Sequence, residues 1–384
     1  MDDVDMDPVG AVRETPSVLW RPDPWLCLGV CVVMGLGLVA LYSSSAVYAL
    51  RTLGDAEHFL KAQLWRIGIG VVALLGMVVT PPGWLRRRSG WFLVAATVLC
   101  GIVLIPGVGR LIGGARRWLT VGPFNLQPGE LAKLAVVLVL ASLLARREAN
   151  QDAEKLPFWL PISLVQIPIF LVLLEPDFGS AMVMEGIVVV LLFIAGFRMR
   201  SFLLAAVCAS PVVYHSLFGT PFRLRRLMSY LDPWAYRDTV GYQSAESQIS
   251  IGSGGFFGVG LGESKQRLFF LPEAHTDFVF AILAEEMGLI GVLVMLAGFG
   301  LIFWRGMRLA MDVDDAFERL LAIGVTSLLA IPTVFNLGVV TGLLPTKGLP
   351  LPFVSYGGSN IVVCLMAVGM LFRIDADRSI RSST

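Results

Sequence analysis

Long apolar runs constrain this chain more than any other feature of its sequence. The hydrocarbon core of a membrane is about 30 Å thick, and a helix needs about 20 consecutive apolar residues to cross it. Hydrophobic residues make up 56% of the chain and charged residues only 15%, whereas soluble domains carry about 25% charged residues. The sequence therefore predicts an all-α, polytopic membrane protein of about ten transmembrane helices, with a large loop between the seventh and eighth. The ten apolar runs span 24–48, 61–80, 89–107, 128–146, 157–174, 178–196, 201–218, 277–305, 317–343 and 354–373.

Basic residues in the short loops predict the orientation of these helices. With a cytoplasmic N-terminus, the inner loops hold arginine clusters at 86–88 and 146–147, and the short outer loops hold fewer basic residues. Cytoplasmic loops carry an excess of Lys and Arg, so both termini are expected in the cytoplasm. The predicted parts are a cytoplasmic tail 1–23, a transmembrane domain 24–373 with an extracytoplasmic loop 219–276, and a cytoplasmic tail 374–384.

Several classes of function are excluded by features that the sequence lacks. The five cysteines fall inside apolar runs without a C-x-x-C pair, and the three histidines are scattered, so neither a zinc site nor a disulfide framework is expected. The sequence has no long basic run that would predict a nucleic-acid partner. It also has no G-x-x-x-x-G-K-[ST] run that would predict a phosphate-binding loop. The motif-rich segments fall on the predicted outer face, where ATP is absent. A synthetic reaction there needs a substrate that is already activated.

The first motif-rich segment runs from residue 114 to 133. Arg116 and Arg117 are adjacent, and paired guanidinium groups can bind phosphate oxygens through two bonds each. Ordinary phospholipid head groups would satisfy them equally well. Glu130 and Lys133 are three residues apart at a predicted helix start, so they share a face and can form an ion pair. Charges this close to the membrane core favour a functional role, although a structural ion pair is compatible with the same pattern.

The second segment, residues 175–180, joins two predicted helices. Pro176 ends the first helix, and Asp177 can cap the second by accepting bonds from its exposed N–H groups. Capping is the favoured interpretation of this motif taken alone.

The third segment is the long loop and the helix start that follows it. Its glycine-rich part, residues 242–262, is expected to lie at the membrane interface or to re-enter the membrane. Asp277 then begins the eighth predicted helix, with His275 close by. A carboxylate here could take a proton from a sugar hydroxyl if burial raised its proton affinity. A capping or first-turn acid is the simpler interpretation.

The fourth segment, residues 341–359, holds several prolines and glycines and predicts an ordered, non-helical outer loop. Such a loop could form the floor of a cavity. It could equally be a rigid connector.

Together these segments resemble the SEDS family (shape, elongation, division and sporulation) of FtsW, RodA and SpoVE. The resemblance covers about residues 25–373 and is carried by LPEAHTDF (271–278) and LPLPFVSYGG (349–358). PTKGLPLP (345–352), LDPW (231–234) and GVGLGESKQ (258–266) are more similar to FtsW and SpoVE than to RodA. Gly129 stands where serine or alanine is usual, Asn360 stands where serine is usual, and Phe269 and Phe270 precede LPEAHTD where some relatives carry an acid.

The resemblance implies a peptidoglycan glycosyltransferase of the cytoplasmic (inner) membrane that polymerises lipid II into β-1,4 glycan strands on the outer face. Septal synthesis in cell division is the expected role, with a class B penicillin-binding transpeptidase and other division proteins as partners. Catalytic roles carry over to Asp277, Glu130 and Lys133. The candidate substrate contacts are Arg116, Arg117, Asp177, His275, Lys347 and Ser355.

The implied reaction is a single displacement with inversion at an α-linked donor sugar. Pyrophosphate leaves well without a general acid, so one carboxylate base is enough, unlike the paired carboxylates of glycoside hydrolysis. Cations must balance the charge on the leaving group. Basic side chains or a divalent ion (Mg²⁺ or Mn²⁺) could do so, with Asp277 or Asp177 as a candidate metal ligand.

Three alternatives stay open at this point. A lipid II flippase would share the polytopic architecture and the intramembrane polar residues. An elongation polymerase of the RodA type would share the chemistry. A non-catalytic scaffold for division proteins would catalyse no reaction but would fit the same membrane topology.

Overall fold

The computed structural model describes residues 22–112, 115–122, 124–149, 159–204, 207, 228–265, 276–346 and 348–383. Within them the chain is a helical bundle, as predicted, and six helices are long and apolar enough to cross a membrane. The helices are α1 (Pro24–Leu53), α2 (His58–Val79), α3 (Pro82–Val103), α4 (Pro128–Ala149), α5 (Trp159–Leu174), α6 (Phe178–Ile194), α9 (Tyr242–Gly254), α10 (Val279–Asp312), α11 (Ala316–Val340) and α12 (Gly358–Ser383).

The predicted spans agree with these helices to within several residues, with two differences of consequence. α12 continues to Ser383, so the segment predicted as a C-terminal tail from residue 374 is helical. The seventh predicted span, 201–218, lies largely outside the described residues.

A small antiparallel sheet between α3 and α4 was not predicted. Its strands are β1 (Arg110–Ile112), β2 (Ala115–Val121) and β3 (Phe124–Leu126), in the order β1-β2-β3. Gly122 has a φ of 60° in the connection between β2 and β3, a conformation that glycine adopts without strain. The strands are short and lie between glycines, so the sequence offers too few residues for a period-two pattern to be recognised.

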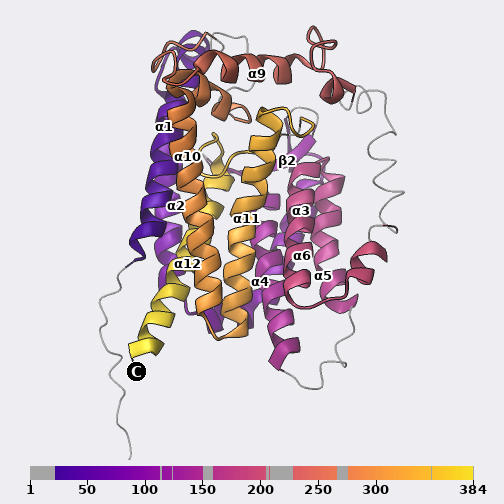
Figure 1. Ribbon diagram of the computed structural model, residues 1–384. Helices are drawn as coiled ribbons and strands as arrows, with labels where there is room; N and C mark the ends of the chain where they lie inside the picture. Colours follow the sequence, from indigo (N-terminus) through magenta and orange to yellow (C-terminus); the bar gives the residue numbers. More distant parts are fainter. Residues whose placement is uncertain are drawn as a thin grey trace, which may run out of the picture.

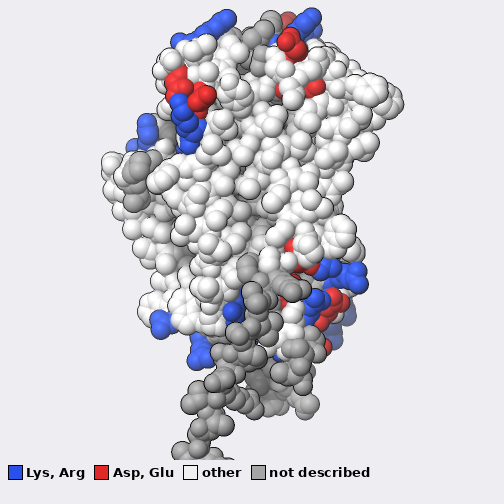
Figure 2. Space-filling view, turned by 90° about the vertical axis from the view of Figure 1, so that its left-hand side faces the viewer, with Lys and Arg blue, Asp and Glu red and all other residues white. Residues whose placement is uncertain are grey.

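The two ends of the bundle differ in structure. α9 lies across one end, here called the α9 end, and the C-terminus lies at the opposite end, called the C-terminal end (Figure 1). Figure 2 shows charged side chains gathered toward both ends, with a broad band of uncharged residues between them. This distribution is that of a protein whose middle lies in hydrocarbon.

Ion pairs tie the helices together at the C-terminal end. Arg378 binds Asp312 at 2.6 Å, and Arg381 binds Glu318 at 2.5 Å, so the end of α12 is fastened to the α10–α11 connection. Asp23 caps α1 and also pairs with Arg305 of α10.

The glycine-rich segment after α9 inserts into a break in α10. Gly288 has a φ of 61° and a ψ of −161°, which interrupts the helix. The N–H groups of Val259 and Gly260 donate to the carbonyls of Glu285 and Glu286 at 3.0 and 3.1 Å. In return, the N–H groups of 289 and 290 donate to the carbonyls of 255 and 256. The loop therefore satisfies the backbone groups that the break leaves open, as a membrane-embedded helix requires.

The buried carboxylates of α10 fasten the same junction. Glu285 accepts hydrogen bonds from Ser264 (2.5 Å), Ser250 (3.3 Å) and the N–H of Lys265 (3.1 Å). Glu286 accepts one from Ser43 of α1 at 2.5 Å. These contacts hold α9, its following loop and α1 against the first part of α10, which begins just after Asp277.

Candidate active site

Glu130 and Lys133 form a buried ion pair in the first turns of α4, the most buried of the six candidate spans. Lys133 Nζ lies 2.7 Å from Glu130 Oε1, and each residue is 2% exposed. The predicted pairing is therefore present. Asn360 of α12 donates to the other carboxylate oxygen at 3.2 Å, a contact that the sequence could not indicate. Asn360 is thus a second hydrogen-bond donor to the Glu130 carboxylate, in addition to Lys133.

Asp177 is the N-cap of α6, as its motif alone predicted. One carboxylate oxygen accepts from the N–H of Ser180 at 3.2 Å. The other accepts from the Ser180 hydroxyl and from Gln127 Nε2, both at 2.9 Å. Asp177 is 5% exposed. The carboxylate therefore joins the start of α6 to the segment that leads into α4.

The two adjacent arginines of β2 do not act as a pair. Arg117 donates from Nε to the carbonyl of Glu175 at 3.1 Å and from Nη2 to that of Pro176 at 2.5 Å. Successive side chains of a strand point to opposite faces, so Arg116 projects away from this turn. The strand thus directs the two guanidinium groups to different sides, and their expected contact with phosphate stays a prediction.

Glu175, which the sequence did not single out, is a fully buried carboxyl group. Neither oxygen has a well-formed hydrogen bond within the described residues, and the neighbouring Cys100 thiol is only a weak donor. Burial, reinforced by the charge of Asp177, raises the pKa of Glu175 to about 8. The group is therefore mostly protonated at neutral pH.

Asp277 does not occupy the cap position that its simpler interpretation assigned to it. The N-cap of α10 is Phe278. The carbonyl of Asp277 accepts from Asn336 Nδ2 at 2.8 Å, and its carboxylate lies against Gly348, where an added Cβ would be 2.7 Å from Oδ2. The side chain is half-buried. Asp277 thus sits between the start of α10 and the loop that follows α11.

Ser355 has a structural role inside that loop. Its hydroxyl accepts from the N–H of Leu351 at 2.8 Å, and its carbonyl accepts from Gln63 of α2 at 3.4 Å. Ser355 is 3% exposed and its hydroxyl bond lies within the loop, and its expected contact with substrate stays a prediction. The candidates His275 and Lys347 lie outside the described residues.

Glycines lie at the close approaches between the segments that carry Asp277, Asp177 and Glu130. Gly348, beside Asp277, also faces Gly179 of α6, whose added Cβ would lie 3.5 Å from the Gly348 carbonyl. An added Cβ on Gly129 would lie 3.9 Å from Ser180, the partner of Asp177. Absent side chains at Gly179 and Gly348 therefore let the start of α6 and Asp277 approach the same loop, and Gly129 lets the start of α4 approach α6.

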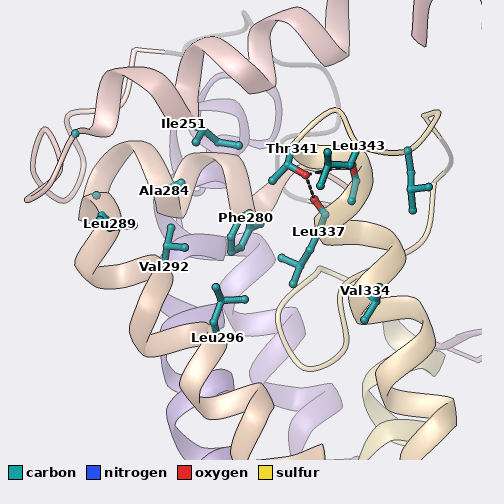
Figure 3. A pocket seen from close by; sticks show the side chains of 14 residues that line it. Ile251, Phe280, Ala284, Leu289, Val292, Leu296, Val334, Leu337, Thr341 and Leu343 are labelled. Carbon is teal, nitrogen blue, oxygen red and sulfur yellow. Dashed lines mark hydrogen bonds between the residues drawn. The ribbon is translucent and has the colours of Figure 1, made fainter. Parts of the chain in front are cut away.

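A separate, apolar hollow of about 580 Å³ lies between α9, α10 and α11. Figure 3 shows Phe280, Val292 and Leu296 of α10 facing Leu337 of α11 across it. Asp277 and the Glu130–Lys133 pair do not line this hollow. The hollow is therefore separate from the polar residues of the candidate active site.

Comparison with known proteins decides the family. The model of the FtsW/RodA/SpoVE family, described as "Cell cycle protein", matches residues 24–380. This chain belongs to the FtsW/RodA/SpoVE family. Stage V sporulation protein E of Bacillus subtilis is 38% identical, over 92% of this chain and 96% of that protein. A "Probable peptidoglycan glycosyltransferase FtsW" of Trichlorobacter lovleyi is 40% identical, over 95% and 96%.

Solved structures of FtsW/RodA/SpoVE proteins share the fold. A chain from a structure reported as "Structural coordination of polymerization and crosslinking by a peptidoglycan synthase complex" superposes with a TM-score of 0.77 at 31% identity, covering 93% of this chain and 98% of that one. Rod shape determining protein RodA of Thermus thermophilus superposes with a TM-score of 0.70 at 29% identity, covering 94% and 98%. The family membership and the helical membrane fold predicted from the sequence are thus confirmed.

Proposed function

We propose that this chain is a peptidoglycan glycosyltransferase that polymerises lipid II into β-1,4 glycan strands, with Asp277 as the catalytic base. The observation that carries the proposal is the position of Asp277. Its carboxylate lies against Gly348, and the N-cap of α10 is Phe278 rather than Asp277. Relatives of about 40% identity carry the name peptidoglycan glycosyltransferase, which supports the same activity.

The reaction balances with this single base. Asp277 takes the proton from the acceptor 4-hydroxyl as its oxygen attacks the anomeric carbon of the donor. The bond from that carbon to the pyrophosphate oxygen breaks, and the electron pair leaves with the polyprenyl pyrophosphate. Inversion converts the α-linked donor into a β-1,4 linkage, and one correctly placed carboxylate is sufficient.

Glu130 and Lys133 support the leaving group in this proposal. Glu130 holds Lys133 at 2.7 Å, and Asn360 holds Glu130. A lysine fixed in this way presents its remaining N–H donors to developing negative charge without first having to reorganise. Arg116 is a second candidate cation, because its side chain is not engaged with the turn that binds Arg117.

The two remaining candidates, a divalent cation and Asp177, are not assigned a step in the reaction. Within the described parts of the chain, no three His, Cys, Asp or Glu side chains lie close enough together to hold a metal ion. Dependence of the polymerisation rate on Mg²⁺ or Mn²⁺ stays a prediction to be measured. Asp177 supports the site as the cap that positions α6.

The cellular setting follows from the same considerations. We propose that both termini lie in the cytoplasm and the α9 end outside the cytoplasmic membrane, which the positive-inside rule supports. A class B penicillin-binding transpeptidase is the proposed partner, because a related chain was solved in a peptidoglycan synthase complex. Identities of 38–41% to SpoVE and FtsW proteins, against 29% to RodA, favour septal or sporulation synthesis over elongation.

The decisive experiment is lipid II polymerisation by the full chain with its transpeptidase partner. Asp277→Asn should abolish glycan synthesis while the protein keeps its fold and its partner. The matched control is Asp238→Asn, an exposed aspartate near α9, which should keep the wild-type rate. A wild-type rate in Asp277→Asn would overturn the assignment, and lipid II translocation without polymerisation by the unaltered chain would favour a flippase.

A further inference from the structure

Arg66 is a basic residue that faces the interior of the bundle from α2. Most of the α2 surface is exposed, but Gln63 and Gly70 are buried, and Gly70 packs against Leu365 of α12. Arg66 lies three residues after Gln63 and four before Gly70. Residues with this spacing share one face of a helix, so Arg66 is on the side of α2 that meets α12.

Among the residues that the structure describes, no carboxylate forms an ion pair with the guanidinium group of Arg66. Its central carbon is 4.2 Å from the centre of the Tyr356 ring. Nη1 is buried and has no hydrogen-bond acceptor within the described part of the chain. A cation at membrane depth is costly unless it is paired or faces a water-filled cavity, so such residues mark functional sites. Contact with Tyr356 orients the group but gives Nη1 no acceptor.

The start of α12 next to Arg66 adds positive charge. An added Cβ on Gly358 would lie 3.5 Å from Arg66 Nε, so the guanidinium group is at the first residue of α12. The beginning of a helix carries a partial positive charge. Ser359 is bonded to the segment 125–127, and Asn360 to Glu130. Neither side chain neutralises Arg66.

Helix α12 links this place to the proposed catalytic machinery. Asn360, which binds the Glu130 carboxylate, is only two residues after Gly358, which touches Arg66. An anion bound at Arg66 would therefore lie on the same first turn of α12 as the contact that holds the Glu130–Lys133 pair. Arg66 itself is only partly buried, so part of its surface is open to a ligand.

We propose that Arg66 binds a phosphate group of the polyprenyl-linked saccharide substrate, with Tyr356 orienting the guanidinium plane. This proposal rests on the proposed polymerase function and adds a substrate-binding residue to it. Guanidinium groups are suited to this ligand because their N–H donors match two phosphate oxygens at once. The same chemistry could bind the phosphate of an ordinary phospholipid, and the experiment has to separate the two sources.

The test measures steady-state polymerisation by the full chain and its partner in vesicles. Arg66→Gln should raise the KM for lipid II about tenfold or more, which is the expected loss of a charge-assisted hydrogen bond, with a smaller change in kcat. Arg66→Lys should recover part of the loss. Arg110→Gln, which removes an exposed arginine of β1, should leave the KM unchanged. Arg66→Met replaces Arg66→Gln if the glutamine variant does not fold.

Two vesicle compositions separate the phosphate sources. The KM difference between wild type and Arg66→Gln should be the same in vesicles of a phosphate-free galactolipid and in vesicles that contain phosphatidylglycerol. A difference that appears only with phosphatidylglycerol would assign Arg66 to ordinary phospholipid and overturn the proposal. An unchanged KM in a variant that polymerises would overturn it as well. Failure of the wild-type protein to polymerise would instead contradict the proposed function.

Discussion

Asn336 of α11 is bonded to the backbone of Asp277. Its amide nitrogen donates to the Asp277 carbonyl at 2.8 Å and to the Leu349 carbonyl at 2.7 Å. The first bond fixes the residue just before the N-cap of α10, and the second fixes the loop after α11. One buried side chain therefore sets the separation between the proposed base and the loop that faces it.

Replacing Asn336 should reduce catalysis without removing any catalytic group. Asn336→Leu leaves two carbonyls without their donor, and each lost hydrogen bond contributes about 0.5–1.5 kcal/mol. We expect kcat for lipid II polymerisation to fall about tenfold or more, because small displacements of a catalytic group cost large factors in rate. Thr341→Val, which removes hydroxyl bonds only within the end of α11, should stay near wild type. Equal losses in both variants would contradict this role of Asn336.

Gly348 provides a steric test of the same site. In Gly348→Ala the new methyl group would lie 2.7 Å from Asp277 Oδ2, so the carboxylate or the loop has to move. Polymerisation should drop while partner binding is retained. Gly357→Ala is the matched control, since its methyl group would meet only the Asn360 side chain at 3.5 Å. If Gly348→Ala is as active as Gly357→Ala, Asp277 does not need its observed position.

The Glu130–Lys133 pair should show strong coupling in stability. Removing one partner of a buried pair leaves an uncompensated charge and costs about 3–5 kcal/mol. Glu130→Gln and Lys133→Met should each lower the unfolding temperature in detergent, and the double variant should lose less than the sum of the two. Lys61→Met, which breaks an exposed pair with Asp55, should change the unfolding temperature little. Additive losses at 130 and 133 would show that the two charges do not interact.

Glu175 should make stability depend on pH. Its pKa is raised from 4.5 to about 8 by burial, so the folded protein holds this proton more tightly than the unfolded chain does. Its effect on the free energy of unfolding therefore becomes increasingly unfavourable as pH rises from about 4.5 to about 8. Glu175→Gln should remove this part of the dependence, and denaturation of both proteins at pH 5 and pH 8 measures it. A stability gap that is the same at both pH values would contradict the raised pKa.

Sequence patterns predicted the parts of the site that depend on local spacing. Glu130 and Lys133 pair because residues three apart share a helix face, and Asp177 caps α6 because it follows Pro176 at a helix start. Both relationships lie within a single turn of helix. A pattern of residue types is sufficient to identify them.

Relationships across the fold were not predictable in the same way. Arg116 and Arg117 looked like a pair because no pattern marked their segment as a strand, and only the strand places them on opposite faces. Glu175 gave no signal, because its isolation depends on burial by other helices. The contacts of Asn336 and Asn360 join residues that are 59 and 230 positions apart in the chain.

The break at Gly288 has a consequence for local unfolding at the α9 end of the molecule. Because Val259 and Gly260 donate to α10 carbonyls, their amide protons belong to the hydrogen-bond ladder of a helix although they are part of a loop. Local unfolding follows cooperative units rather than sequence neighbours. Residues 255–260 and the turns of α10 around Gly288 therefore form one such unit, and their amide protons should exchange with deuterium at a common rate.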